Sequence, residues 1–213
     1  MGTAGRGNGR GVRTGLKWTA GLMSAERLAA KHYVYRLDHD TGFAPHVSGN
    51  ACTLCGCKTT SIEVWAAPGS WVVGIGGNGT GKPNDLIYLM KVESNPTVAE
   101  LRRRSPHLTD YLRGHGIHGL ESRPILVSRR FYYFGKRAIR IPQGLEHLII
   151  RARGCRKATD AEISRLVAHL SARGYAPGVH GAPNNPQPHR PGRCGCSRAT
   201  AKPKYVKRRQ RPA

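Results

Sequence analysis

Two short apolar runs, joined by a polar connection, constrain the fold of this chain more than any other feature. Residues 71–76 read Trp-Val-Val-Gly-Ile-Gly, and residues 86–92 read Leu-Ile-Tyr-Leu-Met-Lys-Val. Their length and β-rich composition are typical of buried strands. The connection, residues 77–84, is rich in Gly and Asn, which suits a turn between paired strands. The sequence therefore predicts a buried β-hairpin near the middle of the chain.

Weaker patterns on both sides of the hairpin complete the prediction of fold class. Further strands are expected at 33–37, 125–128 and 138–142. Thr97 and Glu100 have the spacing of a capping box for a helix that ends near residue 104. Residues 160–173 carry one apolar stripe and predict a second helix. About six strands and two or three helices, without regular alternation, favour an α+β fold with a small, curled, mostly antiparallel sheet.

The charge distribution separates a central domain from basic ends. The formal net charge is +23, and no Asp or Glu occurs before Glu26 or after Glu162. Residues 1–22 are rich in Gly and Arg, and residues 177–213 are rich in Pro, Gly, Arg and Lys. Such segments cannot bury a core, so we expect a disordered arm, a domain at 23–176 and a disordered basic tail. The basic balance attracts polyanions, among which nucleic acid is the commonest.

The first 25 residues lack the apolar stretch of a secretory signal, and no run approaches a membrane span. We therefore expect a cytoplasmic protein without a membrane partner, whose thiols are reduced. Met23 and the residues after it resemble a natural start, so Met1 and Met23 both remain possible first residues.

Residues 38–58 concentrate reactive side chains in what the pattern predicts to be a mostly irregular loop. Gly42, Pro45 and Gly49 interrupt any regular element there. One interpretation is an active site, with Asp40 as base and Cys52 or Cys57 as nucleophile. The cation of Lys58 would lower the pKa of a nearby thiol. The other interpretation is structural, because aspartates in turns commonly hydrogen-bond their own backbone.

The same loop carries cysteines with the close spacing of a metal site. Cys52, Cys55 and Cys57 follow the pattern Cys-x2-Cys-x-Cys, and thiolates at such spacing bind zinc. The alternative, a set of buried cysteines without metal, is favoured because no second zinc-ribbon motif is present.

The turn of the central hairpin partly matches a phosphate-binding loop. Gly76 to Lys82 has the Gly-x4-Gly-Lys spacing, but Pro83 stands where a magnesium-binding hydroxyl is needed. A strand follows in place of a helix. A hairpin turn is therefore the favoured interpretation.

An aromatic run lies among basic residues at 129–137. Phe131-Tyr132-Tyr133-Phe134 is flanked by Arg129, Arg130 and Lys136. Aromatic rings can stack on bases while cations hold phosphates, although alternate aromatics in a strand can equally belong to a core. The residues that we predict to contact nucleic acid are Phe43, Trp71, Tyr88, Lys91, Arg129, Arg130, Tyr132, Tyr133 and Lys136.

Three motifs together resemble a known family. They are residues 40–45 with Cys52-Thr53-Leu54 and Cys57-Lys58, residues 69–74 with 86–92, and residues 127–142 with their Phe-Tyr-Tyr-Phe-Gly run. Over about residues 32–170 the chain resembles the nucleotide modification associated domain, second family, of bacteria and bacteriophages. The resemblance implies association with DNA base hypermodification. The Gly-x-Trp strand and the strand after it also resemble the curled barrels of the PUA-like superfamily, an analogy of fold alone.

Three functional hypotheses follow. The first is a module that binds nucleic acid, expected to be DNA, or a modified base flipped from it, with the basic ends adding sequence-independent affinity. The second is an enzyme that acts on a nucleotide or base through Asp40, Cys52 and Cys57. The third is a toxin or antiphage accessory protein for which DNA is only the context.

Overall fold

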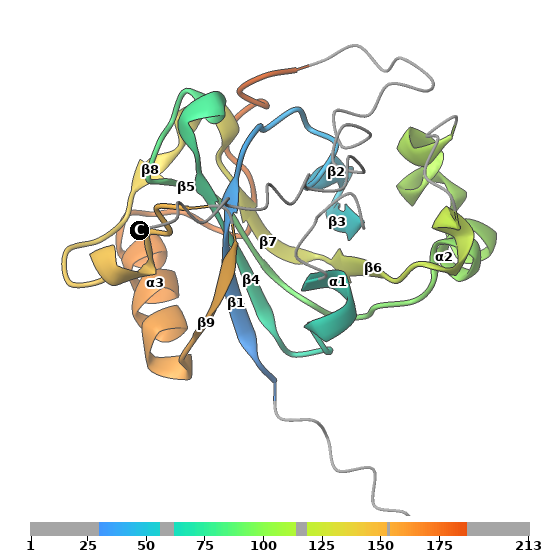
Figure 1. Cartoon of the computed structure of the whole chain (residues 1–213), viewed down its shortest axis with the longest axis horizontal. Helices are drawn as coiled ribbons and strands as arrows, with labels where there is room; N and C mark the ends of the chain where they lie inside the picture. The colour runs from blue at the N-terminus through green and yellow to red at the C-terminus, as the bar shows by residue number, and fades with distance from the viewer. Residues whose placement is uncertain (1–29, 56–61, 114–118, 153, 187–213) are drawn as a thin grey trace, which may run out of the picture.

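The central hairpin forms as predicted, in a computed structural model that describes residues 30–55, 62–113, 119–152 and 154–186 (Figure 1). β4 (Trp71–Gly76) and β5 (Asp85–Lys91) pair in antiparallel fashion across the turn that contains Lys82. Because a strand follows this turn, it lacks the helix that a phosphate-binding loop requires. The predicted hairpin turn is confirmed.

A seven-stranded sheet is built around the hairpin. Its order is β10-β7-β5-β4-β1-β9, and β8 also pairs with β5. The strands added to the hairpin are β1 (His32–Leu37), β7 (Arg130–Tyr133), β8 (Ile139–Arg140), β9 (Cys155–Ala158) and β10 (Gly178–Val179). A smaller sheet has the order β2-β3-β6, formed by β2 (His46–Ser48), β3 (Ala51–Cys55) and β6 (Ile125–Ser128).

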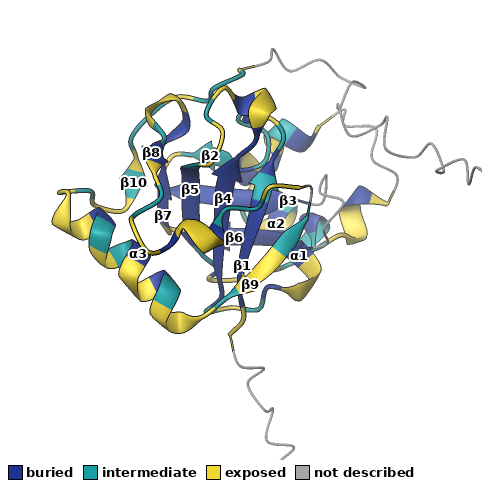
Figure 2. Cartoon of the chain, turned by 60° about the vertical axis from the view of Figure 1, so that its left-hand side comes forward, coloured by how far each residue is buried: buried dark blue, intermediate teal, exposed yellow. Residues whose placement is uncertain are grey.

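Three buried clusters hold these layers together (Figure 2). One face of the large sheet packs against the inner face of the small sheet and against α1 (Ile62–Trp65). The opposite face packs against the apolar stripe of α3 (Asp160–Ala172). The outer face of the small sheet is covered by α2 (Val98–Arg104). In β4 and β7, for example, alternate residues enter different clusters.

The predicted helices begin where their capping residues indicate. Thr97 and Glu100 form a capping box at the start of α2. Thr159 and Glu162 form a second box at the start of α3, whose buried residues are Ile163, Leu166 and Leu170. Each box satisfies two backbone donors that the first helical turn leaves without partners. The α+β class is confirmed.

The sheet differs from the prediction in its closure. Among the residues that the structure describes, six of the eight strand pairs are antiparallel, but β1 pairs with β4 and β10 pairs with β7 in parallel. Within the described residues, the end strands β9 and β10 do not pair with each other, so the sheet is mixed and open. The analogy with a closed PUA-like barrel is not supported.

Two segments are more ordered than the sequence predicts. The expected loop at 38–58 contains β2 and β3, which pair in antiparallel fashion through His46, Val47 and Ser48. The expected tail is structured at 177–186, because β10 pairs with β7 and Lys136 N–H donates to the carbonyl of Ala182. We call residues 177–186 the strap. Residues 1–29 and 187–213, which include the predicted arm and most of the predicted tail, lie outside the described residues.

None of the helices in the described part of the chain has the length and apolar character that a membrane span requires.

Candidate functional site

Asp40 is the centre of a buried clasp. Its side chain is only 1% exposed. One carboxylate oxygen accepts a hydrogen bond from Tyr133 Oη at 2.7 Å, and the other accepts from the backbone N–H and side-chain Nδ2 of Asn184, both at 2.9 Å. The backbone of Asp40 also bonds to Asn185 of the strap. Because three donors occupy the carboxylate, this geometry favours a structural link between β1 and the strap over a base that reaches a substrate.

A row of phenols crosses the large sheet beside this clasp. Tyr35, Gly74, Tyr88 and Tyr133 are successive register partners on β1, β4, β5 and β7, so they lie on one face. A Cβ on Gly74 would lie 2.2 Å from the ring of Tyr88, which leans across the glycine. Tyr88 Oη then lies 2.7 Å from Tyr35 Oη. Burial raises the pKa of all three phenols, and the carboxylate of Asp40 raises that of Tyr133 further.

The cysteines of β3 are placed as core residues. Cys52 and Cys55 are both 0% exposed, and they point into different clusters on opposite faces of the small sheet. They therefore cannot bind one metal ion together. Burial also raises the pKa of the Cys52 thiol, which disfavours the thiolate that a nucleophile needs. The described residues contain no group of three potential metal ligands. Cys57 and Lys58 lie outside the described residues.

Most aromatic residues predicted to stack on bases are buried. Tyr88 is 0% exposed, Tyr132 and Tyr133 are nearly so, and Trp71 is 8% exposed beneath the guanidinium of Arg130. Phe43 packs edge-on against Tyr111. The strand aromatics are core residues in this structure, because alternate residues of β7 fill the clusters on both faces of the sheet.

Among the residues predicted to contact nucleic acid, the basic ones are accessible, but none of the predicted aromatic residues is exposed beside them. Arg129, Arg130 and Lys136 are exposed, and Lys91 is partly exposed. Arg129 lies near Glu93, whose carboxylate also accepts from the Arg129 backbone N–H. The predicted surface at 129–137 thus provides cations without an exposed ring on which a base can stack.

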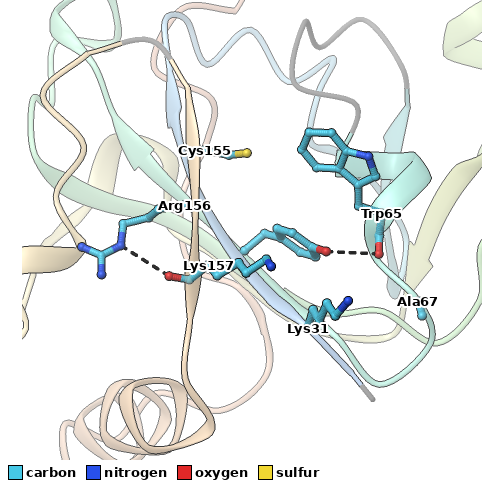
Figure 3. Close-up of a pocket in the computed structure, with 7 residues that line it drawn as sticks. Lys31, Trp65, Ala67, Cys155, Arg156 and Lys157 are labelled. Carbon is cyan, nitrogen blue, oxygen red and sulfur yellow. Dashed lines mark hydrogen bonds between the residues drawn. The ribbon is translucent and has the colours of Figure 1, made fainter. Parts of the chain in front are cut away.

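A groove at the opposite edge of the large sheet does combine exposed aromatic and basic side chains (Figure 3). Its volume is about 560 Å³. It lies between α1 and the edge formed by β1 and β9. Its lining residues are Lys31, Tyr33, Trp65, Ala67, Cys155, Arg156 and Lys157. We call it the Trp65 groove.

Strand register explains which of these side chains face the Trp65 groove. Tyr33 is the register partner of Lys157, and Tyr35 is the partner of Cys155, so all four point to the α1 face of the sheet. Arg156 lies between them in β9 and therefore points to the other face, where its guanidinium donates to the carbonyl of His147. Figure 3 shows the side chain of Lys157 directed toward the groove, and that of Arg156 directed away.

Trp65 forms one wall of the groove. It ends α1 and is 52% exposed, which is unusual for so large an apolar side chain. The hydroxyl of Tyr33 donates to the backbone carbonyl of Trp65 at 3.3 Å, and the two ring centroids are 6.3 Å apart at an interplanar angle of 36°. These contacts hold α1 against β1 while leaving much of the indole accessible.

The charge of the groove has one sign. Its charged lining residues are Lys31, Arg156 and Lys157, and no carboxylate belongs to the described lining. Sequence reasoning missed this site because its members are scattered over residues 31–157 and none lies in a recognisable motif. The apolar pair Val64-Trp65 gave no usable signal, because a helix of four residues shows no period that would separate exposed from buried positions.

Comparisons with known proteins identify the family of the chain. No curated protein and no solved structure matches it. The model of one family matches residues 29–112 and 111–189, which together span most of the chain and include the strap. The chain belongs to the family described as nucleotide modification associated domain 2.

Proposed function

We propose that this chain is a nucleic-acid-binding protein that contacts its ligand through the Trp65 groove. Its membership of a nucleotide modification associated family supports a nucleic acid or nucleotide as the ligand class. The cations Lys31 and Lys157 supply attraction for phosphate, and the accessible indole supplies a surface for a base. The basic ends of the chain add affinity that is independent of sequence.

The observation that carries this proposal is the exposure of Trp65 beside lysines. The three large hydrophobic side chains that are exposed in the described residues are Val64, Trp65 and Val179, and two of them lie on α1. Trp65 contacts Tyr33, yet about half of its side chain is left uncovered beside cations of one sign. It suits a ligand that has both a flat apolar part and negative charge.

Lysine footprinting tests the location of the contact. The full chain is acetylated with and without a single-stranded oligonucleotide, and modification at each lysine is measured by mass spectrometry. We expect the oligonucleotide to protect Lys31 and Lys157 several-fold more than Lys136, which is exposed on the 129–137 surface. Protection of Lys136 and Lys91 without protection of Lys157 would place the contact on that other surface and refute the groove.

A further inference from the structure

We infer that the Trp65 groove receives a single unpaired nucleotide, with its base against Trp65 and its phosphate toward Lys31 and Lys157. This inference rests on the proposed function and specifies its ligand. Figure 3 shows Trp65 and Cys155 at one end of the groove and Lys31 at the other, with Lys157 between them. A nucleotide has the same polarity, because a flat base lies at one end and an anionic phosphate at the other.

The accessible indole selects for an unpaired base. In a duplex, both faces of each base are covered by its neighbours in the stack, so an indole can stack only on a base that is extruded or single-stranded. One side of Trp65 is occupied by the tilted ring of Tyr33, with its centroid 6.3 Å away. Trp65 is 52% exposed, so part of the indole is accessible to a further ring. The groove is therefore built for one base rather than a run of stacked bases.

The shape of the site leads to the same ligand. Proteins that recognise duplex DNA by direct readout insert a helix or a β-ribbon into the major groove. Here α1 has only four residues, and Trp65 lines a concave surface rather than projecting from a convex one. A volume of about 560 Å³ lies within the usual range for sites that enclose a small ligand. The groove is half open, so a nucleotide can lie in it with one side toward solvent.

Strand pairing positions the phosphate contact. Lys157 and Tyr33 are direct cross-strand neighbours, so both side chains face the groove. Lys31 precedes β1 on the same edge. The absence of a carboxylate from the described lining leaves both ammonium groups available to an anion.

Equilibrium binding by fluorescence anisotropy tests the inference on the full chain. The probes are one labelled oligonucleotide as a single strand and the same sequence as a duplex, at a fixed salt concentration. The variants are Trp65→Ala, Trp65→Phe and Lys157→Ala. Val64→Ala is the matched control on α1, because Val64 is 60% exposed and does not line the groove. Arg103→Ala on α2 is the control for loss of a surface cation.

We expect Trp65→Ala to weaken single-strand binding about tenfold, because stacking on an aromatic side chain contributes strongly per base. Duplex binding should change less than twofold, since the basic ends act on both probes alike. Trp65→Phe retains a ring and should recover much of the affinity. Lys157→Ala should weaken single-strand binding and lower its salt dependence, whereas both control variants should match the wild type.

Each other outcome has a distinct meaning. If groove variants leave both probes unaffected, the proposed function fails at this site. If they weaken single strand and duplex equally, the groove binds nucleic acid but does not select an unpaired base, and the inference alone fails. If poly-glutamate displaces the single strand from the wild type as well as an unlabelled strand does, the groove is a site for acidic peptides and the inference is again overturned.

Discussion

A glycine in the middle of the large sheet permits the row of phenols beside the Asp40 clasp. The ring of Tyr88 occupies the space that any larger side chain at position 74 would need. We predict that Gly74→Ala lowers the free energy of unfolding by about 3 kcal/mol, because the new methyl group must displace Tyr88 and disturb its hydrogen bond to Tyr35. Urea denaturation measures the loss.

Gly81→Ala is the control for this substitution. Its φ of 70° penalises a side chain, but nothing lies within 4 Å of the added Cβ. Its cost should therefore be about 1 kcal/mol, from the backbone alone. If the two variants lose equal stability, the close approach of Tyr88 to Gly74 is not the cause.

At the residue scale, the sequence shows which residues lie in strands, but it does not show to which face of the sheet their side chains point. It identifies Trp71, Tyr88 and Tyr133 as strand residues, but the face that each one occupies depends on the layers that cover the sheet. Both faces of β4 and β5 are covered, so no alternation of apolar and polar residues is available to reveal orientation. Trp65 was indistinguishable from a core tryptophan, because α1 is too short to show a helical period.

The capping box of α3 makes this helix sensitive to acid. The backbone N–H of Thr159 donates to the carboxylate of Glu162, and His147 also contacts it, which together lower the pKa of Glu162 to about 2 from an ordinary 4.5. Because the folded pKa is the lower one, the stabilisation is present above pH 4.5 and is lost as the pH falls through about 2. We predict that the free energy of unfolding decreases more steeply over this range in the wild type than in Glu162→Gln. Denaturant titrations at several pH values test this, and parallel curves would contradict it.

The strap is an integral element of the domain. It contributes β10, the His180 ring stacked on Phe134 at a centroid distance of 5.1 Å, and two donors to Asp40. Truncation after Ala176 leaves the buried carboxylate and the edge of β7 without these partners. We predict that it lowers the free energy of unfolding by at least about 3 kcal/mol.

Truncation after Pro186 is the matched control for the strap. It keeps every contact of the described residues, so its unfolding curve in urea should overlay that of the full chain. Equal destabilisation by both truncations would show that the strap contributes nothing of its own.

At the element scale, long and periodic segments were predictable, whereas short polar ones were not. The hairpin β4–β5 and the helix α3 carry strong patterns and formed as expected. The strands β2, β9 and β10 have two to four residues each and little apolar content. The strands β9 and β10 form because they pair with strands that are distant in the sequence. The backbone of β10, for example, bonds to β7 although its own sequence resembles a disordered tail.

Charge at the scale of the whole molecule should set affinity without setting selectivity. Residues 187–213 carry nine of the 35 Lys and Arg residues, and the chain as a whole has a net charge of +23. We predict that truncation after Pro186 weakens binding of duplex and single strand by a similar factor and reduces the slope of log affinity against log salt. The ratio of the two affinities should stay unchanged. Loss of that ratio on truncation would assign the selectivity to the tail instead of the Trp65 groove.

The sequence was least informative about how the layers are assembled. It favours an α+β class and an antiparallel sheet, and six of the eight strand pairs agree. The placement of β1 between β4 and β9 joins residues more than 100 positions apart and brings Lys31, Tyr33 and Lys157 to one edge. Local propensity contains no information about such a juxtaposition, and the Trp65 groove depends on it.

The link between Asp40 and Asn184 also bears on how the protein is made. The two residues are separated by 144 positions, so the carboxylate of Asp40 leaves the ribosome long before its partner exists. The N-terminal half can collapse during translation and β7 can pair with β5, but the outer edge of β7 and the second carboxylate oxygen of Asp40 gain partners only once the strap is synthesised. A chain whose translation stops before residue 177 therefore retains an unpaired edge on β7 and a buried acid that lacks two of its three donors, and unpaired strand edges make incomplete products prone to aggregate.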